Sequence, residues 1–228
     1  MAKKKDTIRQ EGTRSAVWKL IDRDPSIRLD MERGLVNARA LARYCGRQGI
    51  PGSEDAIISA IRRYPQGNAA KKQYDEATLI ASQSTISTKS HIVEISLKKS
   101  GDVQDILPKM FTCISFDRGE TLRLVQGEEA IKVIIDEKNM DKVMAFIPRK
   151  LVISVLKGLA EINMHLHPQA VRTPGIMLVL TGEFARNNIN IYEITSCVPE
   201  MLFFVEEKDI LEAYRVLFEL CHGKPGKA

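Results

Sequence analysis

The sequence predicts an α+β fold in which a small all-α domain precedes two copies of a β-α-β-β-α-β unit. Strand-like and amphipathic helix-like segments alternate through residues 78–222, whereas residues 1–73 contain only helix-like patterns. An internal repeat is also present, because residues 131–147 align without a gap on residues 201–217 at an offset of 70. The expected domains are residues 1–70, 78–150 and 159–222.

The second copy has the clearer pattern. A strand over 161–166 is expected to lead to a turn at Pro174-Gly175, since proline cannot continue a strand ladder and glycine lets the backbone bend. A largely buried helix then begins near Ile176, and Gly182 inside it marks either close packing or a weak point. Two strands and an amphipathic helix complete the copy; these are expected over residues 189–194, 200–205 and 210–218.

The first copy is divergent. Its expected elements are a strand over 91–97, a helix over 102–111 and paired strands over 121–126 and 130–135. Ser100-Gly101-Asp102 replaces the Pro-Gly turn, so we expect this copy to be structural. Between the copies, the apolar spacing within 149–159 predicts a connecting helix.

The N-terminal module is basic and helical. Residues 1–73 hold 16 lysines and arginines against 8 aspartates and glutamates, while the rest of the chain is weakly acidic, and residues 66–73 are interpreted as a linker. Three short helices are expected: one over 14–21, one capped by Asn37 and one capped by Ser53. The last two resemble a helix-turn-helix or winged-helix unit, whose candidate DNA contacts are Arg39, Arg43, Arg47, Arg62 and Arg63.

The acidic start of the third helix argues against that hypothesis. Glu54 and Asp55 stabilise the helix dipole but repel phosphate. The same arginines also suit a solvated face of a small bundle that docks on an enzyme or mediates dimerisation. Both interpretations stay open.

Composition excludes several classes of protein. The 228 residues are 44% hydrophobic, yet no apolar run reaches the roughly 18 residues of a membrane span, and the start of the chain lacks a secretory signal pattern. The four cysteines show no metal-binding spacing, and His165 with His167 lacks a third ligand. We expect a cytoplasmic protein with no metal, no cofactor and no membrane partner.

Catalytic motifs are also missing. The sequence has no Gly-rich phosphate loop with Lys and Ser/Thr and no Gly-x-Ser-x-Gly motif. Glu183 and Glu193 are expected to be ordinary surface carboxylates without partners. The sequence therefore predicts no enzymatic activity and no catalytic residue.

A resemblance to a known family rests on three motifs of the second copy. These are Thr-Pro-Gly-Ile at 173–176, Asn-Ile-Asn-Ile at 188–191 and Glu-Glu-Lys-Asp at 206–209. They resemble the ACT domain, most closely that of the aspartokinase-type group, and the likeness covers residues 78–222. The resemblance implies tandem ferredoxin-like units that bind an amino acid or related metabolite at a shared interface between copies. It implies ligand contacts at Thr173, Pro174, Gly175, Ile176, Asn188 and Asn190, although Arg172 and Thr173 stand where many such turns carry an acidic or other polar partner.

Three functions follow from this pattern. The chain is expected to be a homo-oligomeric metabolite sensor that acts as a transcriptional regulator, or else a regulatory subunit of an amino-acid biosynthetic enzyme. A purely structural dimeriser is the third possibility, because Pro174-Gly175 also fits a plain tight turn and Asn188 a left-handed residue at a helix end.

Overall fold

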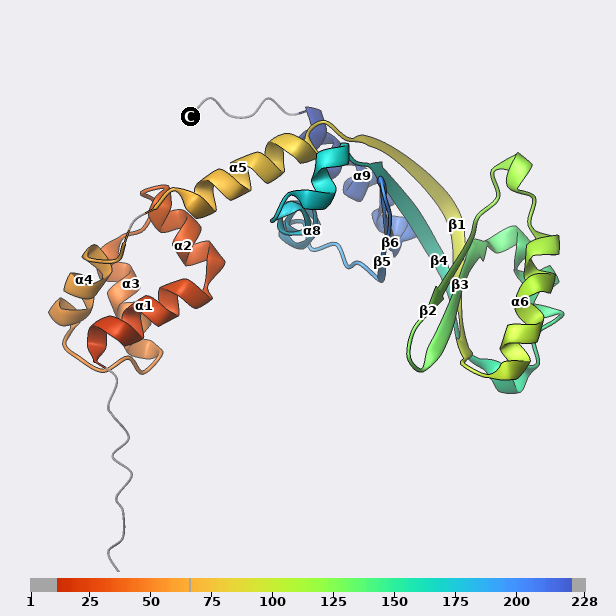
Figure 1. Cartoon of the computed structure of the whole chain (residues 1–228), viewed down its shortest axis with the longest axis horizontal. Coiled ribbons are helices and arrows are strands. Elements are labelled where there is room, and N and C mark those ends of the chain that lie inside the picture. The colour runs from red at the N-terminus through yellow and green to blue at the C-terminus, as the bar shows by residue number, and fades with distance from the viewer. Residues whose placement is uncertain (1–11, 66, 223–228) are drawn as a thin grey trace, which may run out of the picture. The chain divides into compact units, whose positions relative to one another are not determined.

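The computed structural model describes residues 12–65 and 67–222 of the chain, which divides into two compact units (Figure 1). One unit extends to Glu76 and the other begins at Ala77. We call them the helical unit and the sheet unit and describe each by itself.

Four short helices form the core of the helical unit. They are α1 (Thr13–Arg23), α2 (Pro25–Glu32), α3 (Ala38–Arg47) and α4 (Glu54–Arg62). Their apolar sides meet in one cluster, which includes the fully buried Val17, Ile21 and Cys45. The indole of Trp18 donates a 2.9 Å hydrogen bond to the Ala60 carbonyl, which ties α1 to α4.

The predicted caps are confirmed, and one helix was missed. The Asn37 side chain accepts from the backbone N–H groups of Arg39 and Ala40, and the Ser53 hydroxyl accepts from Ala56. Helix α2 was not predicted, although its start carries a strong signal, because Asp24 caps it and Pro25 occupies its first position.

A fifth helix, α5 (Ala69–Ala81), corrects the predicted linker over residues 66–73. Gln66 lies outside the described residues. From Ala69 onward the chain has the alanines, lysines and glutamine that favour helix, and α5 continues until it buries Ala77, Ile80 and Ala81. The start of α5 has residues that favour helix but no apolar periodicity, and for that reason the helix was not predicted.

The sheet unit contains one antiparallel sheet of six strands, in the order β2-β3-β1-β4-β6-β5. This confirms the predicted α+β class. The strands are β1 (Thr85–Lys98), β2 (Leu122–Gln126), β3 (Ala130–Asp136), β4 (Val152–His165), β5 (Glu193–Cys197) and β6 (Glu200–Glu206). The helices are α6 (Gly101–Cys113), α7 (Met140–Met144), α8 (Ile176–Arg186) and α9 (Ile210–His222). Short 3₁₀ turns connect them: η1 (Phe116–Arg118), η2 (Glu137–Asn139), η3 (Arg149–Leu151), η4 (Pro168–Arg172) and η5 (Glu207–Asp209).

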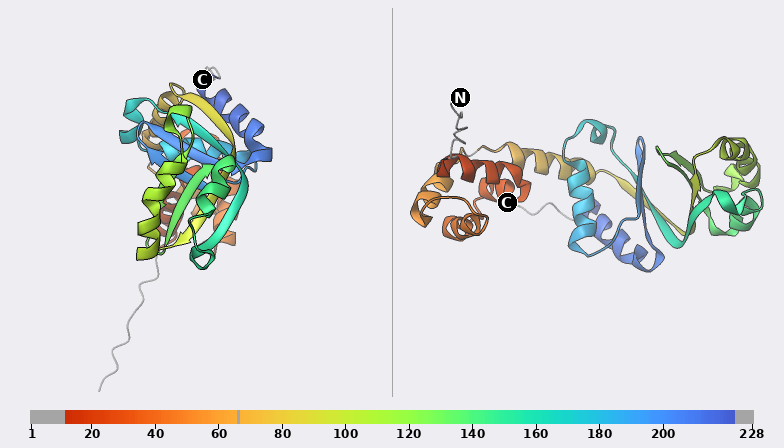
Figure 2. Two further views of the ribbon diagram at one scale, coloured as in Figure 1. Left: turned by 90° about the vertical axis from the view of Figure 1, so that its right-hand side faces the viewer. Right: turned by 90° about the horizontal axis from the view of Figure 1, so that it is seen from below.

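The two repeats share their central strands. The second half of β1 pairs with β3 on one edge and with the first half of β4 on the other, while the first half of β1 pairs with the second half of β4. The second half of β4 pairs in turn with β6. Each repeat thus obtains four strands although the sheet has only six, and Figure 2 shows β1 and β4 running through both halves.

The predicted connecting helix over 149–159 was wrong, because this segment is η3 followed by the first half of β4. Leu151, Val152, Val155, Leu156 and Leu159 have helix-like spacing, but Val152, Ile153 and Val155 are β-branched and favour a strand. Pairing with β1 from Leu97 to Ile92 then decides the conformation.

All four main helices of the sheet unit pack on the same face of the sheet. Val93, Ile95 and Leu97 of β1 contact the core under α6 and α7. On β1 and β4, neighbouring residues point to opposite faces, so Ile92 and its pairing partner Leu159 lie on the helix-free face. There they are buried in a second cluster with Ile134, Leu202 and Phe204.

Two smaller expectations of the second repeat also need correction. The strand predicted over 189–194 begins only at Glu193, after Ile189 has been fixed by a hydrogen bond to Phe184. In α9, the buried residues are Ala213, Val216, Leu217 and Cys221, whereas Leu211 is 81% exposed. The predicted apolar face of α9 is therefore only partly buried against the core.

Candidate functional site

The turn before α8 is built around Gly175. Gly175 has a φ of 90°, a left-handed conformation that favours glycine, and α8 begins at the next residue. Gly175 has no side chain with which to cap this helix start. The first backbone N–H groups of α8 are of the kind that can hold an anionic group such as a carboxylate.

A mainly apolar cavity of about 240 Å³ adjoins this turn. Thr173 and Ile176 line it, and the Thr173 hydroxyl is anchored by a 2.9 Å hydrogen bond to the Gln169 carbonyl. The remaining walls come from the residue that follows β4, from η4 and α8, and from the β5–β6 hairpin: Leu166, Ala170, Val171, Met177, Ser196, Val198, Pro199, Glu200 and Met201. The cavity suits a small aliphatic group more than a charged one.

Asn188 and Asn190 lie at the other end of α8. Asn188 has a φ of 54° and its N–H donates to Ala185, so it ends the helix in the left-handed conformation that asparagine tolerates. Asn190 is hydrogen-bonded to the Tyr192 side chain, whose hydroxyl donates to Glu206 at 2.6 Å. The Glu206 carboxylate and burial raise the pKa of Tyr192.

One chain does not bring these two groups of predicted ligand residues together. Helix α8 has 11 residues, and at a rise of about 1.5 Å per residue it separates its ends by roughly 16 Å. An amino acid held at Gly175 is too small to reach Asn190 of the same chain.

The five candidate DNA-contacting arginines are all exposed, but they are not equally free. Arg39 lies 3.7 Å from the Glu54 carboxylate, and Arg47 lies over the Tyr44 ring at 6.0 Å. Arg39, Arg43 and Arg47 are four residues apart on α3, which places them along one side of that helix. Arg62 and Arg63 lie at the end of α4.

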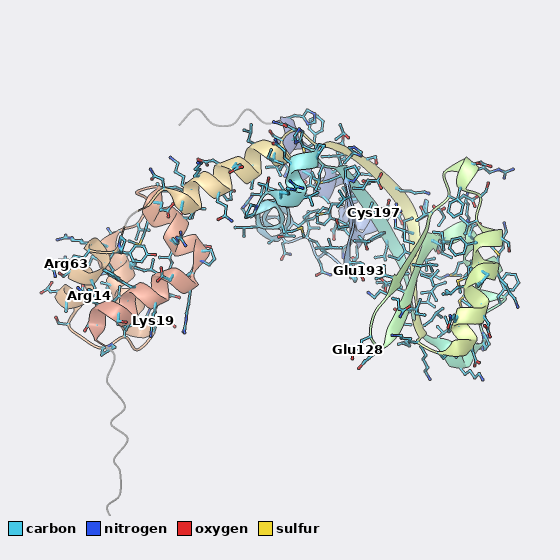
Figure 3. The ribbon with its side chains drawn as sticks, in the orientation of Figure 1. Arg14, Lys19, Arg63, Glu128, Glu193 and Cys197 are labelled. Atoms are coloured by element: carbon cyan, nitrogen blue, oxygen red, sulfur yellow. The ribbon has the colours of Figure 1, made fainter. Side chains whose placement is uncertain are left out.

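Arg14 is a basic candidate that sequence reasoning missed. It lies over the Trp18 ring at 5.4 Å, and Trp18 meets Tyr64 edge to face at 6.1 Å. Arg14 and Arg63 are both labelled in Figure 3. The spacing of Arg14 and Trp18, four residues apart in a predicted helix, was the available signal.

The helix-free face of the sheet carries an ionic cluster that was also missed. Arg123 of β2 donates two hydrogen bonds to Glu161 of β4, and Lys132 of β3 contacts both Glu94 and Glu193. These carboxylates raise the pKa values of Arg123 and Lys132. Glu193, at one end of β5 in Figure 3, is therefore not the unpartnered surface residue that was predicted.

Glu183 was likewise predicted to have no partner, but it forms an ion pair with Arg186. His167 accepts a hydrogen bond from the Gln169 backbone. In residues 12–65 and 67–222, no three His, Cys, Asp or Glu side chains are grouped as metal ligands would be. None of the helices in the same residues combines the length and the apolar character needed to cross a bilayer.

Comparison with known proteins finds similarity among solved structures only. No family model matches the sequence, and neither does any curated protein. Aspartate kinase from Clostridium acetobutylicum is 17% identical, with a TM-score of 0.49, and the match covers 59% of this chain but only 34% of the enzyme.

Two regulatory parts of aspartate kinases are matched over nearly their whole length. A putative C-terminal regulatory domain from Porphyromonas gingivalis is 15% identical with a TM-score of 0.46, and the match covers 61% of this chain and 97% of that domain. The regulatory subunit from Thermus thermophilus is 12% identical with a TM-score of 0.46, and the match covers 59% of this chain and 95% of the subunit.

Proposed function

We propose that this chain is a non-catalytic regulator that binds an amino acid or a related small metabolite through its second repeat. The observation that carries this proposal is the turn at Gly175, which opens α8 without a side-chain cap and adjoins the apolar cavity lined by Thr173 and Ile176. A ligand carboxylate at the first N–H groups of α8 and an aliphatic side chain in the cavity would satisfy both features. The ACT-like motifs of the same segment favour the same ligand class.

Two copies of the chain complete the proposed site. Because about 16 Å of helix separates Gly175 from Asn190 in one chain, Asn190 would come from the partner copy. A ligand that contacts both copies binds the assembled state better than the separate chains. Its differential affinity then shifts the assembly equilibrium, which is the basis of a regulatory response.

A thermal-shift panel of the twenty amino acids on the full chain tests this proposal. Ligand at about 100 times its Kd stabilises the folded state by roughly 2.7 kcal/mol. We expect Met177→Ala, in the cavity wall, and Asn190→Ala to reduce the shift. Leu178→Ala is the matched control, because Leu178 is 55% exposed on the same helix and does not line the cavity. A shift that is unchanged in both test variants rules out this site.

The helical unit supplies the output in this proposal by binding DNA. The arginines on α3 and at the end of α4 would contact phosphates, so affinity should fall steeply with salt and weaken in Arg62→Ala and Arg63→Ala. Binding of a DNA library at two salt concentrations measures this. Affinity that does not depend on salt would reject the role.

A regulatory subunit of a biosynthetic enzyme is the second candidate. The observation that favours it is the ion pair between Arg39 and Glu54, because it neutralises one candidate phosphate contact. The carboxylates in the first turn of α4 would also repel phosphate. This candidate predicts specific co-purification with an amino-acid biosynthetic enzyme, lost in Arg43→Ala, together with no salt-dependent DNA binding.

A further inference from the structure

We propose that the sheet unit holds a second small-molecule site, separate from the turn at Gly175, which binds a zwitterion of the α-amino acid type. The site is a cavity of about 510 Å³ between the two repeats, where the free end of β1 and the second half of β4 meet the segment that leads into β2. Its lining includes Ser87, Lys89, Phe116, Glu120, Arg123, Glu161 and Asn163. This site is independent of the function proposed above.

The cavity exists because the two repeats share strands. Thr85–Lys89 of β1 pair with β4 on one edge, but β3 pairs with β1 only from Ile92 onward. The other edge of this end of β1 has no strand partner among the described residues. The segment around η1 crosses this gap without filling it, which leaves a hollow of the size that ligand sites usually have.

Charged groups of both signs line the hollow in equal number: Lys89 and Arg123 against Glu120 and Glu161. A wall of this kind discriminates against ligands with a net charge and favours a neutral molecule with separated charges. Two of the four groups are already engaged by other parts of the protein. Lys89 uses its three N–H donors on the Gly119 carbonyl, the Thr121 hydroxyl and Asp136.

Glu120 is the second engaged group, with three of its roughly four acceptor positions occupied. It accepts from the Ser115 backbone and the Asn139 amide and pairs with Lys138. The ligand-facing groups are therefore Arg123, Glu161 and their neighbours on the floor of the hollow.

The floor offers an acceptor pair. Glu161 and Asn163 are two residues apart on β4 and point to the same face. Each Glu161 oxygen accepts one bond from Arg123, and a carboxylate has about four acceptor positions in all. The Asn163 Oδ1 is buried and has no hydrogen-bond partner among the described residues. An unpaired buried acceptor is costly, and an ammonium donor placed between these two side chains would satisfy it.

Donors for a carboxylate stand beside this pair. Arg123 has five N–H donors and uses two of them on Glu161. Ser87 lies directly opposite Asn163 in the β1–β4 pairing, and its hydroxyl side chain is exposed. Side chains at opposite positions lie about 4.5–5.5 Å apart at Cβ, so one amino acid can contact both Ser87 and Asn163. Arg123 lines the same cavity and is the third side chain that this ligand would contact. Phe116, 56% exposed at the rim, would cover the ligand side chain.

Thermal shift and calorimetry on the full chain with the twenty L-amino acids test the proposal. We expect at least one amino acid to bind. Its amine and carboxylic acid analogues should bind with at least about tenfold lower affinity, since each lacks one charged group. Asn163→Leu should abolish binding at this site, whereas Asn190→Ala should leave it unchanged. Binding lost in Asn190→Ala and retained in Asn163→Leu would overturn this site and leave the proposed function standing.

A second pair of variants guards against a folding defect in Asn163→Leu. Phe116→Ala should weaken binding, and Phe146→Ala is its matched control, because Phe146 is also an exposed phenylalanine of the sheet unit and does not line the cavity. The ¹⁵Nε resonance of Arg123 should move on titration of the bound amino acid. An unmoved Arg123 resonance, equal effects of the two phenylalanine variants, or a panel without any binding amino acid would overturn the proposal.

Discussion

Arg123 on β2 donates two hydrogen bonds, of 2.8 and 2.7 Å, to Glu161 on β4, although β3 and β1 lie between these strands in the sheet. Neighbouring strands are about 4.8 Å apart, so a flat sheet would separate β2 from β4 by roughly 14 Å. Lys132 and Glu193 make an ion pair between β3 and β5, across three intervening strands. The sheet therefore curls around its helix-free face, and the ionic cluster joins its two halves over the apolar cluster.

Loss of Arg123 should destabilise the sheet unit. The Glu161 side chain is only 5% exposed, so Arg123→Leu leaves a buried carboxylate without its cation, at a cost of about 3 kcal/mol in the free energy of unfolding. Circular dichroism during denaturation follows the secondary structure of both units, and the part of the transition that belongs to the sheet unit should move to lower denaturant. The single tryptophan, Trp18, is in the helical unit, so its fluorescence transition should not move.

The double variant Arg123→Leu/Glu161→Leu separates the charge effect from packing. Apolar replacement of both partners removes the unpaired charge and should recover most of the lost stability. If the double variant is as unstable as Arg123→Leu, the ion pair is not the source of the loss.

Glu120 should make stability sensitive to acid. Hydrogen bonds from Lys138, the Ser115 backbone N–H and Asn139 lower the pKa of Glu120 to about 2. Because the folded pKa lies below the ordinary value of 4.5, the stabilisation is present above about pH 4.5 and is lost as pH falls toward 2. Denaturation curves at several pH values should show a smaller acid-induced loss in Glu120→Gln. Equal pH profiles for the two proteins would contradict this assignment.

The caps of the helical unit can be tested through Trp18. Asn37 accepts two backbone hydrogen bonds at the start of α3, and replacement of such a cap by alanine costs about 1 kcal/mol. Asn37→Ala should therefore shift the Trp18 fluorescence transition to lower denaturant. Arg43→Ala is a control in the same helix, because Arg43 is an exposed residue in the interior of α3. An equal shift in both variants would show that capping is not responsible.

The sequence predicted most elements of the second repeat because their signals are local. Pro174-Gly175 forces a turn, Ile176 begins a helix, and the apolar run over 201–205 is a buried strand. Caps at Asn37 and Ser53 were equally readable, since a cap depends on residues within one turn.

The main misses in the sheet unit depend on partners far along the chain. Leu151 to Leu159 has helix-like spacing, and only the long β1 as a neighbour makes it a strand. Glu161 and Arg123 are 38 residues apart, and nothing in either segment shows that the sheet curls to join them. The cavity beside Asn163 is invisible for the same reason, because it arises from strand sharing between repeats.

Replacement of Gly182 tests whether this glycine is a weak point of α8 or is required by close packing. A Cβ at this position would meet only the end of the Arg186 side chain, at 3.3 Å from Nη1, and a flexible guanidinium can move by that little. Gly182→Ala should thus gain helix propensity worth about 1 kcal/mol and stabilise the sheet unit.

Gly175→Ala provides the contrast, because the φ of 90° costs a side-chain-bearing residue roughly 1–2 kcal/mol and should destabilise the same unit. Thermal unfolding of both variants gives the two signs. If Gly182→Ala destabilises the chain instead, then close packing that the single chain does not show, such as a second copy against α8, is what requires glycine there.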